Sequence, residues 1–135
     1  MKVVVSDKKS GRTAQFELAK ESEAALIGKK IGEMMEGAAV NLEGYKLQIT
    51  GLSDNTGSPS RREVEGSRKA YVLLNSGAGI KHMKKGKRLR KLVRGNTVST
   101  DTGQVNTVIT EYGSKGVEEL FPKKAAVAEK AQEAK

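Results

Sequence analysis

The side chains best able to do chemistry in this sequence are cationic and lie in one short segment. Residues 81–94 contain eight lysines and arginines and no acidic residue. These eight are Lys81, Lys84, Lys85, Lys87, Arg88, Arg90, Lys91 and Arg94. Lysine offers a compact charge, and arginine offers a planar fork that can hold two phosphate oxygens. Because such a run repels itself unless it meets a polyanion, we predict that it contacts nucleic-acid phosphates. A solvated basic surface or a targeting signal is the alternative.

The net charge of the whole chain comes from the same region. The 135 residues carry a formal charge of +9. Residues 61–94 contain twelve basic and two acidic residues, whereas basic and acidic residues nearly balance on either side of them. Other polar side chains in or beside this region complete the set of predicted nucleic-acid contacts. They are Arg61, Arg62, Arg68, Lys69, His82 and Asn96. We expect Arg94, which lies beside a glycine turn, to contribute more than any single lysine.

Residues suited to catalysis are scarce. The chain has no cysteine and one histidine, His82, which excludes cysteine chemistry and leaves triad chemistry and metal sites poorly supplied. Neighbouring acids, at Glu63/Glu65 and at residues 118–119, are typical of solvated turns and helix surfaces. The loop at residues 76–81 lacks the closing Gly-Lys-Ser/Thr of a phosphate-binding loop. We therefore predict no enzymatic activity, no metal, no cofactor and no small-molecule substrate.

Short strands must position the cations. Alternating apolar residues or short apolar runs predict six strands, at residues 1–5, 12–18, 45–50, 69–75, 96–100 and 104–112. The run at 69–75 suits a strand that is buried on both faces. One short helical turn is expected within residues 20–31. Short strands separated by glycine turns predict an all-β fold, as a small six-stranded barrel-like or strongly bent antiparallel sheet.

The chain has the length of one domain with one hydrophobic core. We expect that domain to span residues 1–113 and to include the basic segment 81–95. Residues 114–135 are rich in Ala, Glu and Lys, which predicts a short helical or disordered tail. No apolar stretch approaches the ~18 residues of a membrane span, and no signal peptide is evident. These features predict a soluble, cytoplasmic protein that contacts no membrane.

The aromatic residues are few, and none lies in the basic run. Phe16, Tyr45 and Tyr71 fall on apolar strand faces, which predicts that they pack in the core. Modules that bind single strands stack bases on aromatic side chains. We therefore expect recognition through phosphates and the shape of a folded nucleic acid. Without that partner, residues 81–94 are expected to be mobile.

Three sequence blocks, in their order, resemble a known family. Residues 44–59 read GYKLQITGLSDNTGSP, which resembles its Gly-Tyr…Thr-Gly-Gly-Ser-Asp…Gly-Phe-Pro signature. Residues 84–99 read KKGKRLRKLVRGNTVS, which resembles its basic run and Val-Arg-Gly-Asn-Thr block. A short Val-Leu-Leu at 72–74 lies between them. Over residues 1–113 the chain is thus similar to the eS-six (S-six-e) family of small-subunit ribosomal proteins of archaea and eukaryotes.

This resemblance implies a barrel-like β domain lodged on small-subunit ribosomal RNA, beside neighbouring ribosomal proteins and without catalysis. The chain departs from the family at Leu52, at Ser58 and at residues 79–82, where Gly-Phe-Arg-Pro is usual. We expect these departures to change loop contacts but not charge-driven binding. Eukaryotic members continue into a long basic helix with phosphorylated serines, whereas the last serine here is Ser114. We therefore predict an archaeal member without that phosphorylation control.

Two other functions stay open. A free nucleic-acid-binding regulator or DNA-compacting protein would use the same cations, but duplex DNA would compete with ribosomal RNA. A protein-interaction module would set the cations against an acidic partner. The objection to a protein-interaction module is that no large apolar anchor is evident beside the basic run, whereas stable interfaces tend to use Tyr, Trp or Phe.

Overall fold

The molecule is built mainly of short strands, as the alternating pattern predicts. The computed structural model describes residues 1–77, 80, 85–113 and 121. Its elements in chain order are β1 (Lys2–Ser6), β2 (Thr13–Glu17), α1 (Lys20–Ala24), β3 (Met34–Glu36), the 3₁₀ turn η1 (Gly37–Val40), β4 (Lys46–Asp54), β5 (Lys69–Leu74), β6 (Leu89–Arg94) and β7 (Thr102–Glu111). Within these described residues, no helix has the length and apolar character needed to span a membrane.

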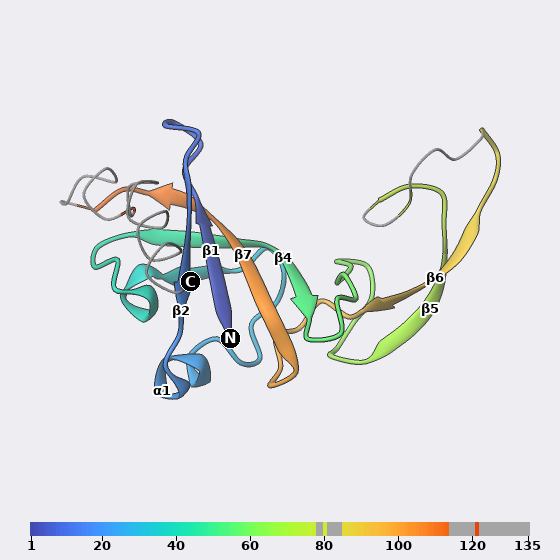
Figure 1. The fold of residues 1–135 in the computed structure, drawn as a ribbon, viewed down its shortest axis with the longest axis horizontal. Helices are drawn as coiled ribbons and strands as arrows, with labels where there is room; N and C mark the ends of the chain where they lie inside the picture. The colour runs from blue at the N-terminus through green and yellow to red at the C-terminus, as the bar shows by residue number, and fades with distance from the viewer. Residues whose placement is uncertain (78–79, 81–84, 114–120, 122–135) are drawn as a thin grey trace, which may run out of the picture.

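A five-stranded sheet forms the body of the molecule (Figure 1). Its strands lie in the order β2-β1-β7-β4-β3, with β1 parallel to β7 and the other neighbours antiparallel. The parallel pair joins distant parts of the chain, since Val3 lies opposite Val105. The register between β4 and β7 shifts at three places, and such irregularities bend a strand. The sheet ends at β2 on one side and at β3 on the other.

The core lies on one face of this sheet. Val3 and Val5 of β1, Leu47 and Ile49 of β4, and Val105 of β7 are fully buried. Each alternates with more exposed neighbours, which is the period of two that a half-buried strand requires. Burying one such side chain contributes about 1.5–3 kcal/mol. The antiparallel pairing of β1 with β2 confirms the predicted first hairpin, and β4 confirms the predicted strand at 45–50.

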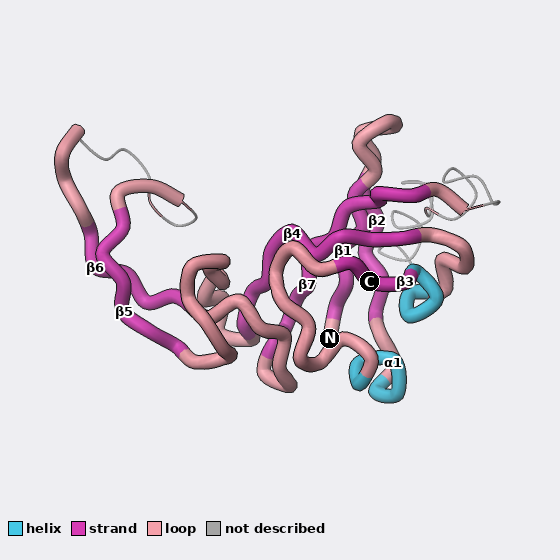
Figure 2. The backbone as a smooth tube through the Cα atoms, turned by 180° about the vertical axis from the view of Figure 1, so that it is seen from behind, coloured by secondary structure: helices cyan, strands magenta, loops and turns pink. Residues whose placement is uncertain are grey.

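β5 and β6 form a separate two-stranded sheet, which projects from the body (Figures 1 and 2). We call these two strands and the residues that join them the arm. They run antiparallel, from Lys69 opposite Arg94 to Leu74 opposite Leu89. The arm is tied to the body at its root, where the Arg94 N–H donates to the Pro59 carbonyl at 3.0 Å.

The predicted six-stranded barrel-like sheet is wrong in part, because two strands form the arm. The chain is mainly β, but the strands do not close into a barrel, and the described residues hold seven strands instead of six. β3 has only three residues, which is too few to show an alternation of apolar and polar side chains. β6 was not predicted because its sequence, LRKLVR, lies within the basic run. Residues 96–100 form no strand and contribute only an isolated bridge, between Thr97 and Lys30. Since β6 leaves the body to pair with β5, no strand in the described part of the chain links the sheet edges β2 and β3.

The predicted tail at residues 114–135 lies outside the described residues, apart from Phe121. This side chain is buried against the core cluster. Its ring meets that of Phe16 edge to face, with centroids 6.4 Å apart. Phe121 thus packs on the body, next to the edge strand β2.

Candidate nucleic-acid interface

The arm gathers most of the predicted contacts on one projecting element. Between Gly66 and Gly95 the sequence has ten lysines and arginines and no acidic residue. Those that the structure describes as exposed are Arg68, Lys69, Lys85, Lys87, Arg88, Arg90 and Lys91. The other predicted contacts in the connection, Lys81, His82 and Lys84, lie outside the described residues. The sheet body contributes none of these cations.

The pairing of β5 with β6 decides which side chains share a face of the arm. Tyr71 lies opposite Leu92, and Leu73 lies opposite Arg90, so these four side chains share one face. Lys91 lies opposite Val72 and therefore projects from the other face. Cations thus flank the arm on both sides, with an apolar strip between them on one side.

Tyr71 and Leu73 do not pack in any core. Their exposed fractions are 64% and 62%. The predictions that Tyr71 is a core residue and that 69–75 is buried on both faces are therefore wrong, because among the described residues β5 pairs only with the cationic β6. The Arg90 guanidinium lies over the Tyr71 ring, 5.3 Å from its centroid. The aromatic ring is the kind of anchor that the sequence seemed to lack beside the basic run.

Arg94 differs from the other cations because it points into the root of the arm. Its side chain is only 5% exposed. Nη1 lies 2.9 Å from an Asp54 carboxylate oxygen, and Nη2 lies 3.1 Å from one of Asp101. Nη2 also donates to the Ser99 hydroxyl at 2.7 Å. With these partners in place, the guanidinium holds β6 against the ends of β4 and β7.

Asp54 is the carboxylate around which the root is built. Its side chain is 2% exposed, and Lys69 Nζ lies 2.8 Å from it. The hydrogen bond from Lys69, followed by those from Arg94, Asn55 and Thr56, lowers the pKa of Asp54 to about 2, against the opposing effect of burial. In the sequence, Asp54 stood out only as part of the block at residues 44–59, so its role at the root was not predicted. The signal that could have indicated it is an acidic residue at the end of an amphipathic strand.

Asn96 also serves the root. It is buried, its side-chain amide donates to the Arg62 carbonyl at 3.1 Å, and its side-chain oxygen accepts from the Thr97 hydroxyl at 3.0 Å. Asn96 therefore orders the junction between arm and body. Like Arg94, it offers little free hydrogen-bonding capacity to a nucleic acid.

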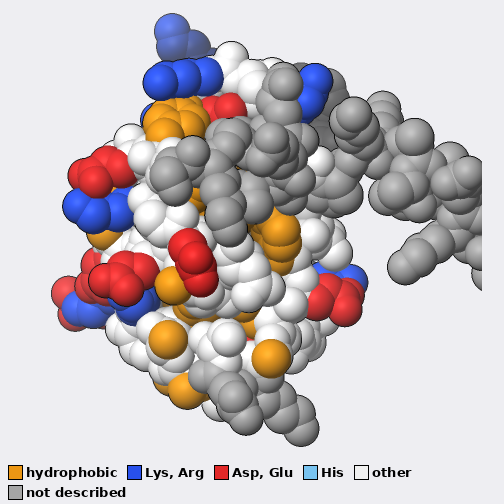
Figure 3. Space-filling view, turned by 90° about the vertical axis from the view of Figure 1, so that its left-hand side faces the viewer, with side chains coloured by type: hydrophobic (Ala, Val, Ile, Leu, Met, Phe, Trp, Pro, Cys, Tyr) orange, Lys and Arg blue, Asp and Glu red, His pale blue; other side chains and the backbone are white. Residues whose placement is uncertain are grey.

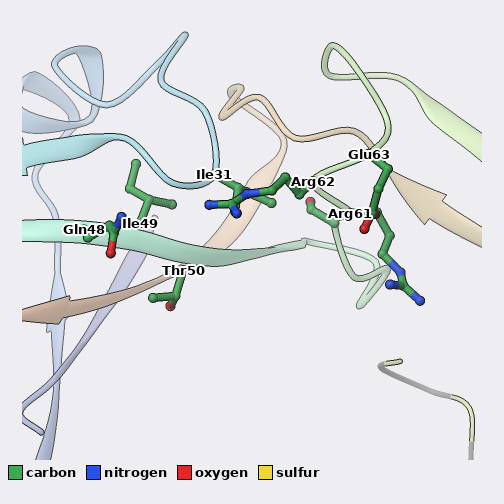
Figure 4. Close-up of a pocket in the computed structure, with 8 residues that line it drawn as sticks. Ile31, Gln48, Ile49, Thr50, Arg61, Arg62 and Glu63 are labelled. Carbon is green, nitrogen blue, oxygen red and sulfur yellow. The ribbon is translucent and has the colours of Figure 1, made fainter. Parts of the chain in front are cut away.

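Arg61 and Arg62 lie at a cleft between the body and the root of the arm (Figure 4). The cleft has a volume of about 370 Å³ and is lined by Ile31, Gln48, Ile49, Thr50, Ser60, Arg61, Arg62 and Glu63. In Figure 4 the Arg62 side chain runs along the cleft toward Ile31. The Arg61 guanidinium donates to the Ser76 carbonyl, which ties the root to the residues after β5. Arg62 is exposed and carries a positive charge next to the arm.

The body is balanced in charge, unlike the arm. Figure 3 looks at the end of the body farthest from the arm, where acidic and basic side chains lie side by side. The ion pairs of the body include Lys46 with Glu111, at 2.8 Å, and Lys2 with Glu17, at 3.7 Å. Among the described residues, no three His, Cys, Asp or Glu side chains form a group that would hold a metal ion. A cationic arm on a neutral body is suited to contact a polyanion.

Comparison with known proteins gives consistent matches. The family model of ribosomal protein S6e matches residues 1–122. A small ribosomal subunit protein eS6 of Methanocaldococcus jannaschii is 49% identical over 120 residues, which cover 89% of each chain. The eS6 protein of Methanococcus maripaludis strain C5 is 52% identical over 113 residues, or 84% of this chain and 89% of its own. That of Methanosphaerula palustris is 39% identical over 128 residues, or 95% and 97%.

Proposed function

This chain belongs to the ribosomal protein S6e family, and we propose that it is a structural protein of the small ribosomal subunit that binds ribosomal RNA through its arm. Its relatives from archaea are named small ribosomal subunit proteins, which supports the assignment to that subunit. The resemblance of the sequence blocks to this family is confirmed by the match over residues 1–122. The observation that carries RNA binding is the concentration of ten cations and no acid between Gly66 and Gly95.

In this proposal the arm reaches into folded RNA and neutralises phosphates on both of its faces. The contacts on the arm are Arg68, Lys81, His82, Lys84, Lys85, Lys87, Arg88, Arg90 and Lys91, with Arg61 and Arg62 at the root. Arg94, Lys69 and Asn96 position the arm, because their side chains are already engaged there. A two-stranded ribbon alone is marginally stable in water, so RNA on both faces would also order the arm. Neighbouring ribosomal proteins are further expected partners.

The test measures RNA affinity as a function of salt. If about six of these cations meet phosphate, log affinity falls with log salt at a slope of roughly −4 to −5. Replacing Lys85, Lys87 and Arg88 together by Gln is expected to make the slope shallower by about two to three. The matched control replaces three exposed body cations, Lys2, Lys8 and Lys30, by Gln and should leave the slope unchanged.

Sedimentation of cell lysate in a density gradient separates this proposal from its rival. The chain is expected to migrate with the small subunit at moderate salt and to dissociate only at high salt. Equal slopes for the two triple variants would refute the role of the arm. Migration with chromosomal DNA, with duplex DNA competing as well as ribosomal RNA, would favour a free regulator or DNA-compacting protein.

A further inference from the structure

One face of the arm exposes an apolar strip that phosphate binding does not use. Tyr71 and Leu73 of β5 and Leu92 of β6 lie on this face, and all three belong to the large apolar side chains that remain exposed. Exposed apolar groups that lie together commonly mark a binding surface. No residue of β5 or β6 belongs to the core cluster of the body. The described residues of the body thus leave the strip uncovered, so that a partner can occupy it.

The charge around the strip identifies the chemistry of that partner. A protein that covered it would need an apolar patch framed by acids, because ten cations and no acid lie between Gly66 and Gly95. An unpaired nucleotide combines an apolar surface with negative charge in one group. It offers a flat base with a π face, and it is joined on both sides to phosphates. A polyanion with exposed bases therefore matches both the strip and the cations around it.

Tyr71 has the geometry of a stacking platform. Its ring is the only aromatic one on either strand of the arm, and it is largely exposed. The Arg90 guanidinium lies over the ring, 5.3 Å from its centroid, so a cation is already held at this aromatic surface. Leu92, directly opposite Tyr71, extends the apolar surface beneath a base. Aromatic side chains with neighbouring cations bind unstacked bases irrespective of sequence.

We propose that Tyr71 stacks an unpaired nucleobase of RNA, with Leu92 beside it and with Arg90 holding the adjoining phosphate. This inference rests on the proposed function, because it takes the arm to lie on RNA. It adds that the arm recognises an unpaired position, such as a bulge or loop, and not only phosphates along a helix.

The experiment compares two RNA hairpins, one with a single bulged 2-aminopurine and one fully paired. Replacing Tyr71 by Leu is expected to weaken binding to the bulged hairpin by about tenfold and to leave the paired hairpin unaffected. Tyr71→Phe keeps the ring and should retain affinity. The 2-aminopurine fluorescence should be quenched by the wild-type chain and by Tyr71→Phe, but not by Tyr71→Leu. Since the side chain is largely exposed, thermal unfolding should be nearly unchanged in both variants.

Lys91→Gln distinguishes failure of stacking from failure of RNA binding, since Lys91 lies on the opposite face. It should make the salt slope shallower by somewhat less than one on both hairpins. If Lys91→Gln does so while Tyr71→Leu binds the bulged hairpin like the wild type, stacking is refuted and a protein becomes the better occupant of the strip. If neither variant changes binding to either RNA, and the triple replacement of Lys85, Lys87 and Arg88 by Gln also leaves the salt slope unchanged, the proposed function is refuted, and this inference with it.

Discussion

Arg94 and Lys91 lie three residues apart on one strand, yet they have different surroundings and therefore different roles. Lys91 is exposed and has only Val72 opposite it. Arg94 is buried between two carboxylates and a hydroxyl. The planar guanidinium suits this position, because it can meet Asp54 and Asp101 with different nitrogens at once. At the scale of single residues, a cation in a basic run can thus either be free to contact a partner or be buried in ion pairs that position the residues making those contacts.

Replacing Arg94 by Met tests this assignment at the residue scale. The variant leaves the buried Asp54 with only Lys69 opposite it, and losing one partner of a buried ion pair costs about 3 kcal/mol. We expect urea unfolding to register that loss. The salt slope of RNA binding should be unchanged.

Lys91→Met is the matched control for Arg94→Met, with the same new side chain on an exposed position. Its unfolding free energy should stay within about 0.5 kcal/mol of the wild type. Its salt slope should become shallower by somewhat less than one. The reverse pattern, in which Arg94 sets the slope and Lys91 sets stability, would restore Arg94 as a phosphate contact.

At the scale of elements, the arm stands away from the body because its root is closely packed. The Gly95 N–H donates to the Arg68 carbonyl at 2.9 Å, and the Thr97 N–H donates to the Gly66 carbonyl at 3.2 Å. The chain leaving β6 therefore crosses the chain that enters β5 without room for a side chain. A Cβ atom at Gly95 would overlap the Gly66 carbonyl oxygen and lie 2.7 Å from its carbon.

Gly95→Ala is therefore expected to destabilise the protein by about 2 kcal/mol, since the contact is with backbone that cannot rotate away. Chemical denaturation measures the change. Gly51→Ala is the control, because a Cβ there meets nothing nearer than the Asn106 amide nitrogen, at 3.9 Å. Gly51→Ala should be neutral or slightly stabilising. Equal losses for the two variants would mean that the crossing at Gly95 is not the cause.

The elements also show where sequence patterns suffice. β2 and β4 were predicted because each carries its own period of two, β1 because it is a short run of β-branched residues, and β7 as one of a last pair of strands. The pairing of β1 with β7 was not predicted, since no local pattern specifies which distant strand is a neighbour. Tyr71 was misjudged for a related reason: an apolar run shows what a strand can bury, but not whether anything covers it. Likewise, the sequence alone does not distinguish Arg94 from the other cations of the basic run, because its partner Asp54 is distant in the sequence.

At the scale of the whole molecule, the protein divides into a neutral body that folds around its own core and an arm that carries the charge. The fifteen buried residues of the core cluster include none from β5 or β6. Lys69 lies opposite Arg94 at the root, and both bind Asp54. The body is therefore expected to keep its structure if the arm is cut beyond this pair.

A deletion that replaces residues 70–93 by Asn-Gly tests this division. The two residues suit a tight hairpin turn, which would connect Lys69 to Arg94 and keep the root intact. The deletion removes seven lysines and arginines and no acid, so the formal charge falls from +9 to +2. We expect cooperative thermal unfolding like that of the full chain, together with a loss of RNA affinity of at least about a hundredfold at moderate salt. An unfolded variant would show that the body needs the arm, and a folded variant with undiminished affinity would move the RNA-binding surface to the body.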